Sequence, residues 1–132
     1  MRLYADASAL VKLIVSEPES IHLARAIPKD AEVVTSALSL VEVVCAARLA
    51  ELEDDTEVEP DEVLSGCTLV HVDLGILLGA AALVSRSLPT LDSIHLASAI
   101  DAAPDLFVTY DRQLGRAARV AGLRVEAPGV RP

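Results

Sequence analysis

Two kinds of hydrophobic pattern alternate along the chain. Short runs of apolar, often β-branched residues predict buried strands, and longer segments with apolar positions every three or four residues predict helices. The predicted strands cover residues 3–5, 31–35, 68–73, 105–110 and 123–128, and the predicted helices cover residues 8–15, 18–27, 36–51, 61–66, 74–87, 90–103 and 112–121. Strands that alternate with helices pair in parallel and carry helices on both faces, so the pattern predicts an α/β fold.

The length and composition fit one small globular unit. A chain of 132 residues suits a single domain over residues 1–132, and 52% apolar residues are enough for a core without disulfides. This core is expected to be aliphatic, because the aromatic residues are only Tyr4, Phe107 and Tyr110. No apolar run is long enough to span a membrane and no secretion signal precedes the first strand, which predicts a soluble cytoplasmic protein.

The cysteines and the net charge narrow the kinds of site and partner. Cys45 falls in an apolar helical pattern and is expected in the core; neither it nor Cys67 forms a CxxC pair, so no zinc site is expected. The formal charge of −9 should repel nucleic acid unless cations or basic patches reverse the field, and it should attract a basic partner. The acidic connector 53–62 is either a solvated turn or a surface for a partner.

Two aspartates stand where a predicted strand passes directly into a predicted helix. Asp6 ends "LYAD" and Asp111 ends "FVTYD". Aspartate is a preferred helix N-cap, so each residue has an ordinary structural explanation. The carboxyl ends of parallel strands are also where ligands bind in α/β proteins, so a role in binding is the alternative.

Glu42 lies in a predicted helix that is apolar almost all round. Such a helix is expected to be buried, and no lysine or arginine lies within one turn of the glutamate. An unpaired buried charge is too costly to keep ionised. We therefore expect a cation or other polar groups to hold Glu42, with a solvent-facing position as the alternative.

Asp92 lies in "PTLDSIHLASAI", within the first turn of a predicted helix. Thr90 can cap this helix, and a negative charge in the first turn is favoured by the helix dipole. The small residues that follow would allow another element to approach closely. His95, one turn further on, either orients Asp92 or packs in the interior, and packing is the favoured interpretation.

The four acids together suggest a metal centre. Carboxylates that are brought together raise each other's pKa, and a hard cation relieves the repulsion. A site with oxygen ligands and no His or Cys cluster favours Mg²⁺ or Mn²⁺, and magnesium held by carboxylates typically serves phosphate substrates.

Four segments in order resemble PIN-domain ribonucleases, specifically VapC toxins of VapBC toxin–antitoxin systems. The segments are "YADASALVKL", "TSALSLVEV", "LDSIHLASA" and "FVTYDRQLGRAARVAGLRVEAPG". The resemblance covers nearly the whole chain. It implies a three-layer α/β/α fold with a central, mostly parallel sheet of about five strands.

The resemblance also implies a site and an activity. Asp6 and Asp92 would be the main Mg²⁺ ligands, Glu42 and Asp111 would complete or orient them, and the hydroxyls of Ser8 and Thr109 would support them. The implied activity is hydrolysis of RNA phosphodiesters by a toxin, with Mn²⁺ able to replace Mg²⁺. The implied partners are structured RNA such as tRNA or rRNA, a VapB-like antitoxin whose tail occupies the groove near the acids, and a second copy of the chain.

Basic residues are candidates to contact the RNA backbone. Arg112, Arg116 and Arg119 share one helix face directly after Asp111, and this face is either a phosphate-binding ridge or a solvated surface. Other basic residues named as candidates are Lys12, Arg48 and Arg86. With so few aromatic side chains, broad base stacking cannot supply the affinity, so shape and backbone contacts are expected to dominate.

Other readings of the acids make further demands on the sequence. A dehalogenase-type phosphotransferase needs a second aspartate two residues after the first, where this chain has Ser8. A receiver-like signalling module needs an adjacent acidic pair near the first strand and a late lysine at a strand end, and this chain has neither. A housekeeping PIN-domain nuclease without an antitoxin stays open as the alternative.

Overall fold

The structure is a computed structural model, and it describes residues 1–51 and 58–131. The strands are β1 (Arg2–Ala5), β2 (Glu32–Ser36), β3 (Cys67–Val70), β4 (Leu106–Val108) and β5 (Val125–Glu126). The helices are α1 (Ala7–Val11), α2 (Ser20–Ala26), α3 (Ser39–Glu51), α4 (Pro60–Leu64), α5 (Leu74–Leu83), α6 (Thr90–Ala102) and α7 (Arg112–Val120). The strands form one parallel sheet in the order β3-β2-β1-β4-β5.

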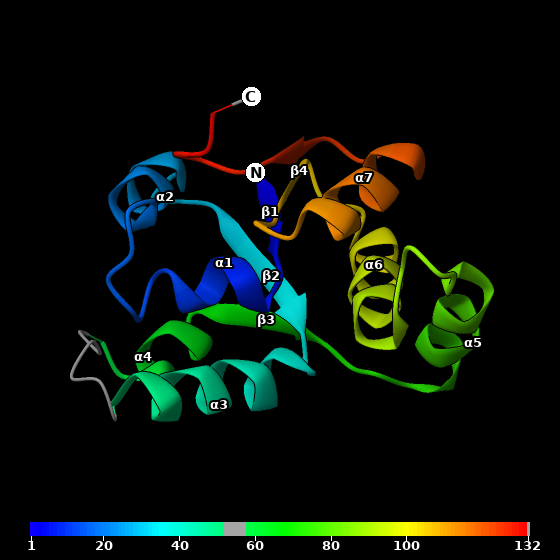
Figure 1. The fold of residues 1–132 in the computed structure, drawn as a ribbon, viewed down its shortest axis with the longest axis horizontal. Coiled ribbons are helices and arrows are strands. Elements are labelled where there is room, and N and C mark those ends of the chain that lie inside the picture. The colour runs from blue at the N-terminus through cyan, green and yellow to red at the C-terminus, as the bar shows by residue number, and fades with distance from the viewer. Residues whose placement is uncertain (52–57, 132) are drawn as a thin grey trace.

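Helices cover both faces of this sheet and make three layers (Figure 1). Helices α1 to α4 pack against one face, and α6 and α7 pack against the other, with α5 outside α6. Successive side chains of a strand point to opposite faces, so β1 sends Leu3 and Ala5 into the first core and Tyr4 into the second. The predicted α/β fold with its central parallel sheet is confirmed.

The chain reverses direction across the sheet at β1. From this central strand it runs outward through β2 to β3, with α1 to α4 on one face. It then returns across the other face through α5 and α6 to β4, on the opposite side of β1 (Figure 1). In parallel α/β sheets, ligands bind at the carboxyl ends of the two strands that flank such a reversal. The fold therefore marks the ends of β1 and β4 as the place to look for a site.

Several helices are shorter than the sequence predicts, and at the start of α3 a polar side chain bonds to the backbone in place of the helix. The helix expected from residue 36 begins at Ser39, since β2 extends through Ser36 and the Ser36 hydroxyl accepts the Leu38 N–H at 3.1 Å. The helix expected to reach residue 87 ends at Leu83, and Ser85 and Leu88 pair in a short bridge. The strand expected at 68–73 ends at Val70.

Helix α3 differs most from its prediction. Val43 and Ala47 are buried in the first core, but Val41 and Leu49 are 64% and 67% exposed, and Cys45 between them is also exposed. The predictions that the whole helix is buried and that Cys45 is a core residue are wrong. Only one stripe of the helix reaches the sheet side, and the apolar residues on the outer stripe face solvent.

Two sequence predictions concern long segments. Among the described residues, no helix is both long and apolar enough to cross a membrane. Residues 52–57 lie outside the described residues and include half of the acidic connector 53–62, so the choice between a solvated turn and a partner surface stays a prediction. The connector ends in α4, which begins with Pro60 at its first position.

Candidate functional site

Asp6 lies at the carboxyl end of the central strand and is 4% exposed. Its Oδ1 accepts the Ala9 N–H at 3.1 Å, which makes it the N-cap of α1, and it accepts the Ser8 hydroxyl at 2.6 Å. Its Oδ2 accepts the Thr109 hydroxyl at 2.7 Å. Burial raises the pKa of Asp6, although the Ser8 and Thr109 hydroxyls favour its charged form. The cap is confirmed, and it coexists with a buried carboxylate at the predicted position.

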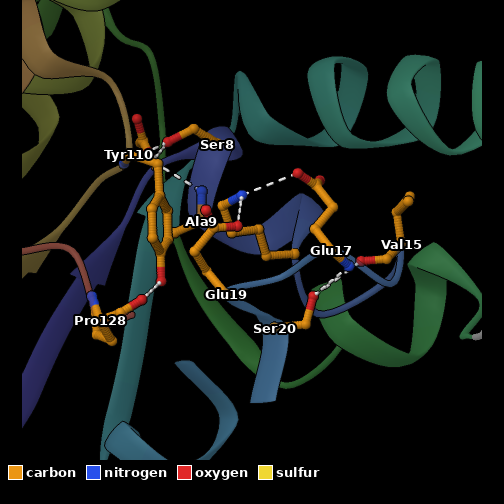
Figure 2. Close-up of polar contacts among 10 residues, drawn as sticks. Ser8, Ala9, Val15, Glu17, Glu19, Ser20, Tyr110 and Pro128 are labelled. Carbon is orange, nitrogen blue, oxygen red and sulfur yellow. Dashed lines mark hydrogen bonds and ion pairs between the residues drawn. The ribbon is translucent and has the colours of Figure 1, made fainter. Parts of the chain in front are cut away.

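Two hydroxyls join the ends of β1 and β4. Thr109 donates to Asp6 and accepts the Asp111 N–H at 3.1 Å. The Ser8 hydroxyl accepts the Tyr110 N–H at 2.9 Å, as Figure 2 shows. Asp111 in turn caps α7 by accepting the Leu114 N–H at 3.1 Å. Both hydroxyls therefore hold Asp6 beside the segment that carries Asp111, and their supporting role in a metal site stays a prediction.

Glu42 is held by a histidine that the sequence analysis assigned to packing. His95 Nε2 lies 2.6 Å from Glu42 Oε1, and His95 Nδ1 lies 2.8 Å from the Tyr4 hydroxyl. His95 is 2% exposed, whereas the Glu42 side chain is 28% exposed. The prediction that other groups hold Glu42 is confirmed. The packing interpretation of His95 is incomplete, because the buried ring also makes two polar contacts.

No local sequence pattern predicts the chain of contacts from Tyr4 through His95 to Glu42. Tyr4 and His95 are 91 residues apart, and His95 and Glu42 are 53 residues apart. The usable signals were indirect: Tyr4 occupies the middle of a strand, and a histidine sits among small buried residues one turn after Asp92. Both fit an ordinary core equally well.

Asp92 lies in the first turn of α6, as predicted, although the N-cap is Pro89 rather than Thr90. Its pKa is raised to about 6 by burial first and by the charge of Asp111 second; the charges of Asp6 and Glu42 also raise it, and His95 opposes them. The four predicted acids, Asp6, Glu42, Asp92 and Asp111, thus share one electrostatic environment. We call them the acid group.

The acid group has the donor chemistry of a site for a hard cation. All its ligand atoms are carboxylate oxygens, and the repulsion that raises the pKa of Asp92 is what a divalent cation would relieve. In the described part of the chain, no three acidic, histidine or cysteine side chains converge closely enough to enclose an ion as they stand. The group fits a cation in chemistry and charge but not as a finished cage.

A basic cleft adjoins the acid group. Arg112, Arg116 and Arg119 line a cleft of about 1000 Å³ whose wall also includes Thr109 and Asp111. The arginines are exposed on one face of α7, and we call them the arginine row. The predicted shared face is confirmed, and it opens onto a concave surface beside the acids.

Lys12 lines the same cleft but is already engaged. Its Nζ donates to Glu17 and Glu19 at 2.9 Å each, and it lies 4.6 Å from the centroid of the Tyr110 ring (Figure 2). Burial disfavours the charged lysine, but the two glutamates outweigh it and raise the pKa of Lys12. That Lys12 contacts phosphates stays a prediction, in which a phosphate would compete with Glu17 and Glu19 for the ammonium group. The lysine also supports Tyr110, whose hydroxyl donates to the Pro128 carbonyl at 2.7 Å.

A model of the PIN domain family matches residues 3–120. The chain belongs to the PIN domain family. Two curated relatives of this PIN domain come from Mycobacterium tuberculosis H37Rv: Ribonuclease VapC46 is 38% identical over 128 residues and Ribonuclease VapC35 is 41% identical over 133. Each alignment covers 96% of this chain and 97% of the relative. The resemblance inferred from the four sequence segments is confirmed.

Solved structures agree on the fold. A toxin–antitoxin complex from Klebsiella pneumoniae contains a chain that matches with a TM-score of 0.63 and 21% identity, over 84% of this PIN domain and 87% of that chain. The structure of VapBC2 from Rickettsia felis bound to a promoter DNA fragment matches with a TM-score of 0.63 and 14% identity, over 96% and 98%. The order β3-β2-β1-β4-β5 also differs from the 2-1-3-4-5 order of flavodoxin-like sheets, which receiver modules share.

Proposed function

We propose that this PIN domain is a Mg²⁺-dependent endoribonuclease and the toxin of a toxin–antitoxin pair. The observation that carries the proposal is the placement of Asp6 and Asp111 at the carboxyl ends of β1 and β4, where the sheet reverses direction. The raised pKa of Asp92, to which the charges of Asp6, Glu42 and Asp111 contribute, supports it. Acids that repel one another at a ligand-binding position serve function rather than stability. The curated relatives at 38% and 41% identity are named as ribonucleases, which supports the substrate class.

Asp6 and Asp92 would hold the cation, and Glu42 and Asp111 would complete or orient the site. A bound divalent cation supplies a water of lowered pKa and neutralises charge on the leaving oxygen. The chain's own contribution is placement: Ser8 and Thr109 fix Asp6, and α7 presents Asp111 through its cap. Mn²⁺ would replace Mg²⁺ because both prefer carboxylate oxygens.

The arginine row is proposed to bind the RNA backbone. It faces the cleft that contains Thr109 and Asp111, so a strand of RNA lying along α7 would reach the acid group. These local positive charges also answer the objection that a chain of charge −9 repels RNA. Recognition through backbone and shape favours structured targets such as tRNA or rRNA.

The proposed partners are a VapB-like antitoxin and a second copy of this chain, acting in the cytoplasm. Solved structures with the same fold include a toxin–antitoxin complex and VapBC2, which supports an antitoxin here. An acidic toxin surface suits a basic partner segment. The tail of such an antitoxin would lie near the acid group, where the charge is negative, rather than along the arginine row.

The activity is tested with purified protein and a structured RNA substrate. Cleavage should require Mg²⁺ or Mn²⁺, stop with a chelator, and disappear in Asp6→Asn. Asparagine caps a helix as well as aspartate does, so this variant keeps the α1 cap and removes the charge. The matched control is Asp73→Asn, because Asp73 caps α5 by the same contact with the Ile76 N–H and lies outside the acid group. Equal cleavage by Asp6→Asn and the wild type would contradict the proposed site.

The biological role needs a second experiment. Expression of the wild-type chain should arrest growth, and co-expression of the protein encoded beside it should restore growth; Asp6→Asn should not arrest growth. Cleavage in vitro without growth arrest or rescue would favour the housekeeping nuclease instead.

A further inference from the structure

The contact chain Tyr4–His95–Glu42 links the buried middle of the sheet to the acid group. Tyr4 is fully buried on the central strand, His95 is 2% exposed, and Glu42 reaches the surface at 28% side-chain exposure. The ring therefore lies between a rigid buried hydroxyl and a carboxylate that faces the site. None of the sequence motifs, taken separately, required this arrangement.

The partners of His95 fix the direction of one of its two hydrogen bonds. A carboxylate can only accept, so Nε2 donates to Glu42 Oε1. Nδ1 makes the second hydrogen bond, with the Tyr4 hydroxyl at 2.8 Å. Burial, reinforced by the charge of Asp6, raises the pKa of Tyr4, so its hydroxyl keeps its proton and can take either role in this bond.

The anchor at the buried end is rigid. The Tyr4 ring stacks on Phe107 with centroids 5.2 Å apart and planes 6° apart, and it meets the His95 ring edge-on at 6.2 Å. Because Tyr4 cannot move without disturbing the central strand, His95 has one orientation in which both contacts form.

We propose that His95 is a positioning residue for Glu42, and that Tyr4 fixes the orientation in which His95 does so. The inference rests on the proposed nuclease function for its activity readout, although cation binding tests it separately. A planar carboxylate whose Oε1 is held has its Oε2 restricted as well, so Glu42 would be presented to the cation in one direction. Partners that orient a ligand in this way commonly change metal affinity or activity by about 10–100-fold when removed.

Two substitutions of His95 separate its two contacts. The amide nitrogen of His95→Gln reaches the position of Nε2 and can donate to Glu42, but the bond with the Tyr4 hydroxyl is then lost. His95→Asn keeps a polar group near Nδ1 for Tyr4 and loses the donor to Glu42. Tyr4→Phe removes the buried hydroxyl and leaves the ring stack.

The affinity for Mg²⁺ or Mn²⁺, measured by calorimetry, should fall by about 10-fold or more in His95→Asn. In His95→Gln it should stay within about 3-fold of the wild-type affinity. RNA cleavage should follow the same order through kcat, with KM for RNA unchanged. Tyr4→Phe should lose affinity to an intermediate degree. A matched control is Leu96→Val, a neighbouring core residue at 1% exposure, which should lower Tm without changing cation affinity.

The outcomes distinguish this inference from the proposed function. If the wild type cleaves RNA and His95→Asn binds cations and cleaves as well as His95→Gln, the positioning role is overturned and the nuclease stands. If the wild type binds cations and the His95 order holds without any RNA cleavage, the nuclease proposal fails and the positioning role stands. Equal losses in His95→Asn, His95→Gln and Leu96→Val would reduce His95 to a residue of the core.

Discussion

Replacing Asp92 with asparagine should stabilise the folded protein at neutral pH. Burial and the charges of Asp111, Asp6 and Glu42 disfavour the ionised form of Asp92 and together raise its pKa to about 6. The amide is neutral, so it removes the repulsion at nearly constant size. The variant would lose the proposed activity and gain stability, as expected where the residues of a functional site destabilise the fold.

The size of the gain follows from the pKa. A rise from 3.8 to about 6 corresponds to about 3 kcal/mol without solvent screening, because one pKa unit equals about 1.4 kcal/mol. Asp92 is partly exposed, so screening reduces this to about 1.5 kcal/mol. The lost interaction with the N-terminal dipole of α6 opposes the gain by about 0.5 kcal/mol. We expect a net gain of about 1 kcal/mol in the free energy of unfolding above pH 7.

The pH dependence gives the sign an independent check. Because the folded pKa of Asp92 lies above 3.8, the folded state binds this proton more tightly than the unfolded state. This contribution to stability is present below pH 3.8 and is lost as the pH rises through about 6. The advantage of Asp92→Asn over the wild type should therefore grow between pH 4 and pH 7 and stay constant above.

Urea denaturation at several pH values, without divalent cations, measures this difference. The matched control is Asp61→Asn, an exposed aspartate in the first turn of α4, which loses the same kind of dipole interaction without relieving repulsion. It should be neutral or slightly destabilised at every pH. Added Mg²⁺ should stabilise the wild type more than Asp92→Asn. A variant no more stable than the wild type at pH 7.5, with an unchanged pH profile, would refute the reasoning.

Two further substitutions test the packing around the site and on α3. Thr109→Val removes the hydroxyl that donates to Asp6, and it should cost about 2 kcal/mol in urea denaturation, whereas Thr68→Val on the exposed side of β3 should be within about 0.5 kcal/mol of the wild type. Equal effects of the two would contradict the assigned contact. Val43→Ala should cost about 2 kcal/mol, whereas Leu49→Ala on the same helix should cost less than about 0.5 kcal/mol. A large loss at Leu49 would mean that the outer stripe of α3 is covered.

The alternation of strands and helices and the place of Asp6 and Asp111 could be predicted because both depend on local pattern. A short apolar run that ends in aspartate and continues as a helix encodes the strand, the turn and the cap within a few residues. Parallel pairing then brings the ends of β1 and β4 to one edge of the sheet. The topology thus places Asp6 and Asp111, which are 105 positions apart in the sequence, on the same edge of the sheet.

Helix α3 could not be assigned correctly from hydropathy. Val41, Cys45 and Leu49 are as apolar as the buried Val43 and Ala47, yet they lie on the outer stripe. Apolar composition shows that burying a surface is favourable, but it does not show which part of the molecule or which partner covers that surface. The same limit applies to His95, because a buried ring among small residues fits a core whether or not its nitrogens are used.

The electrostatic destabilisation that the acid group causes is divided unevenly among its members. This uneven division explains how the fold tolerates four neighbouring carboxylates. Asp6 is the most deeply buried acid, but three donors hold it: the Ser8 and Thr109 hydroxyls and the Ala9 N–H. Each of these donors favours the charged form and offsets part of the burial that raises its pKa.

Asp92 receives its opposing contribution mainly from the charge of His95, while three acids act against it. The mutual repulsion of the acids therefore acts more on Asp92, the more exposed of the two, where protonation relieves it without disturbing the central strand. On this reasoning, a bound cation changes Asp92 more than Asp6. The stabilisation of the protein by Mg²⁺ should accordingly depend mainly on the carboxylate of Asp92, whereas the arrangement of the site depends mainly on the contacts of Asp6.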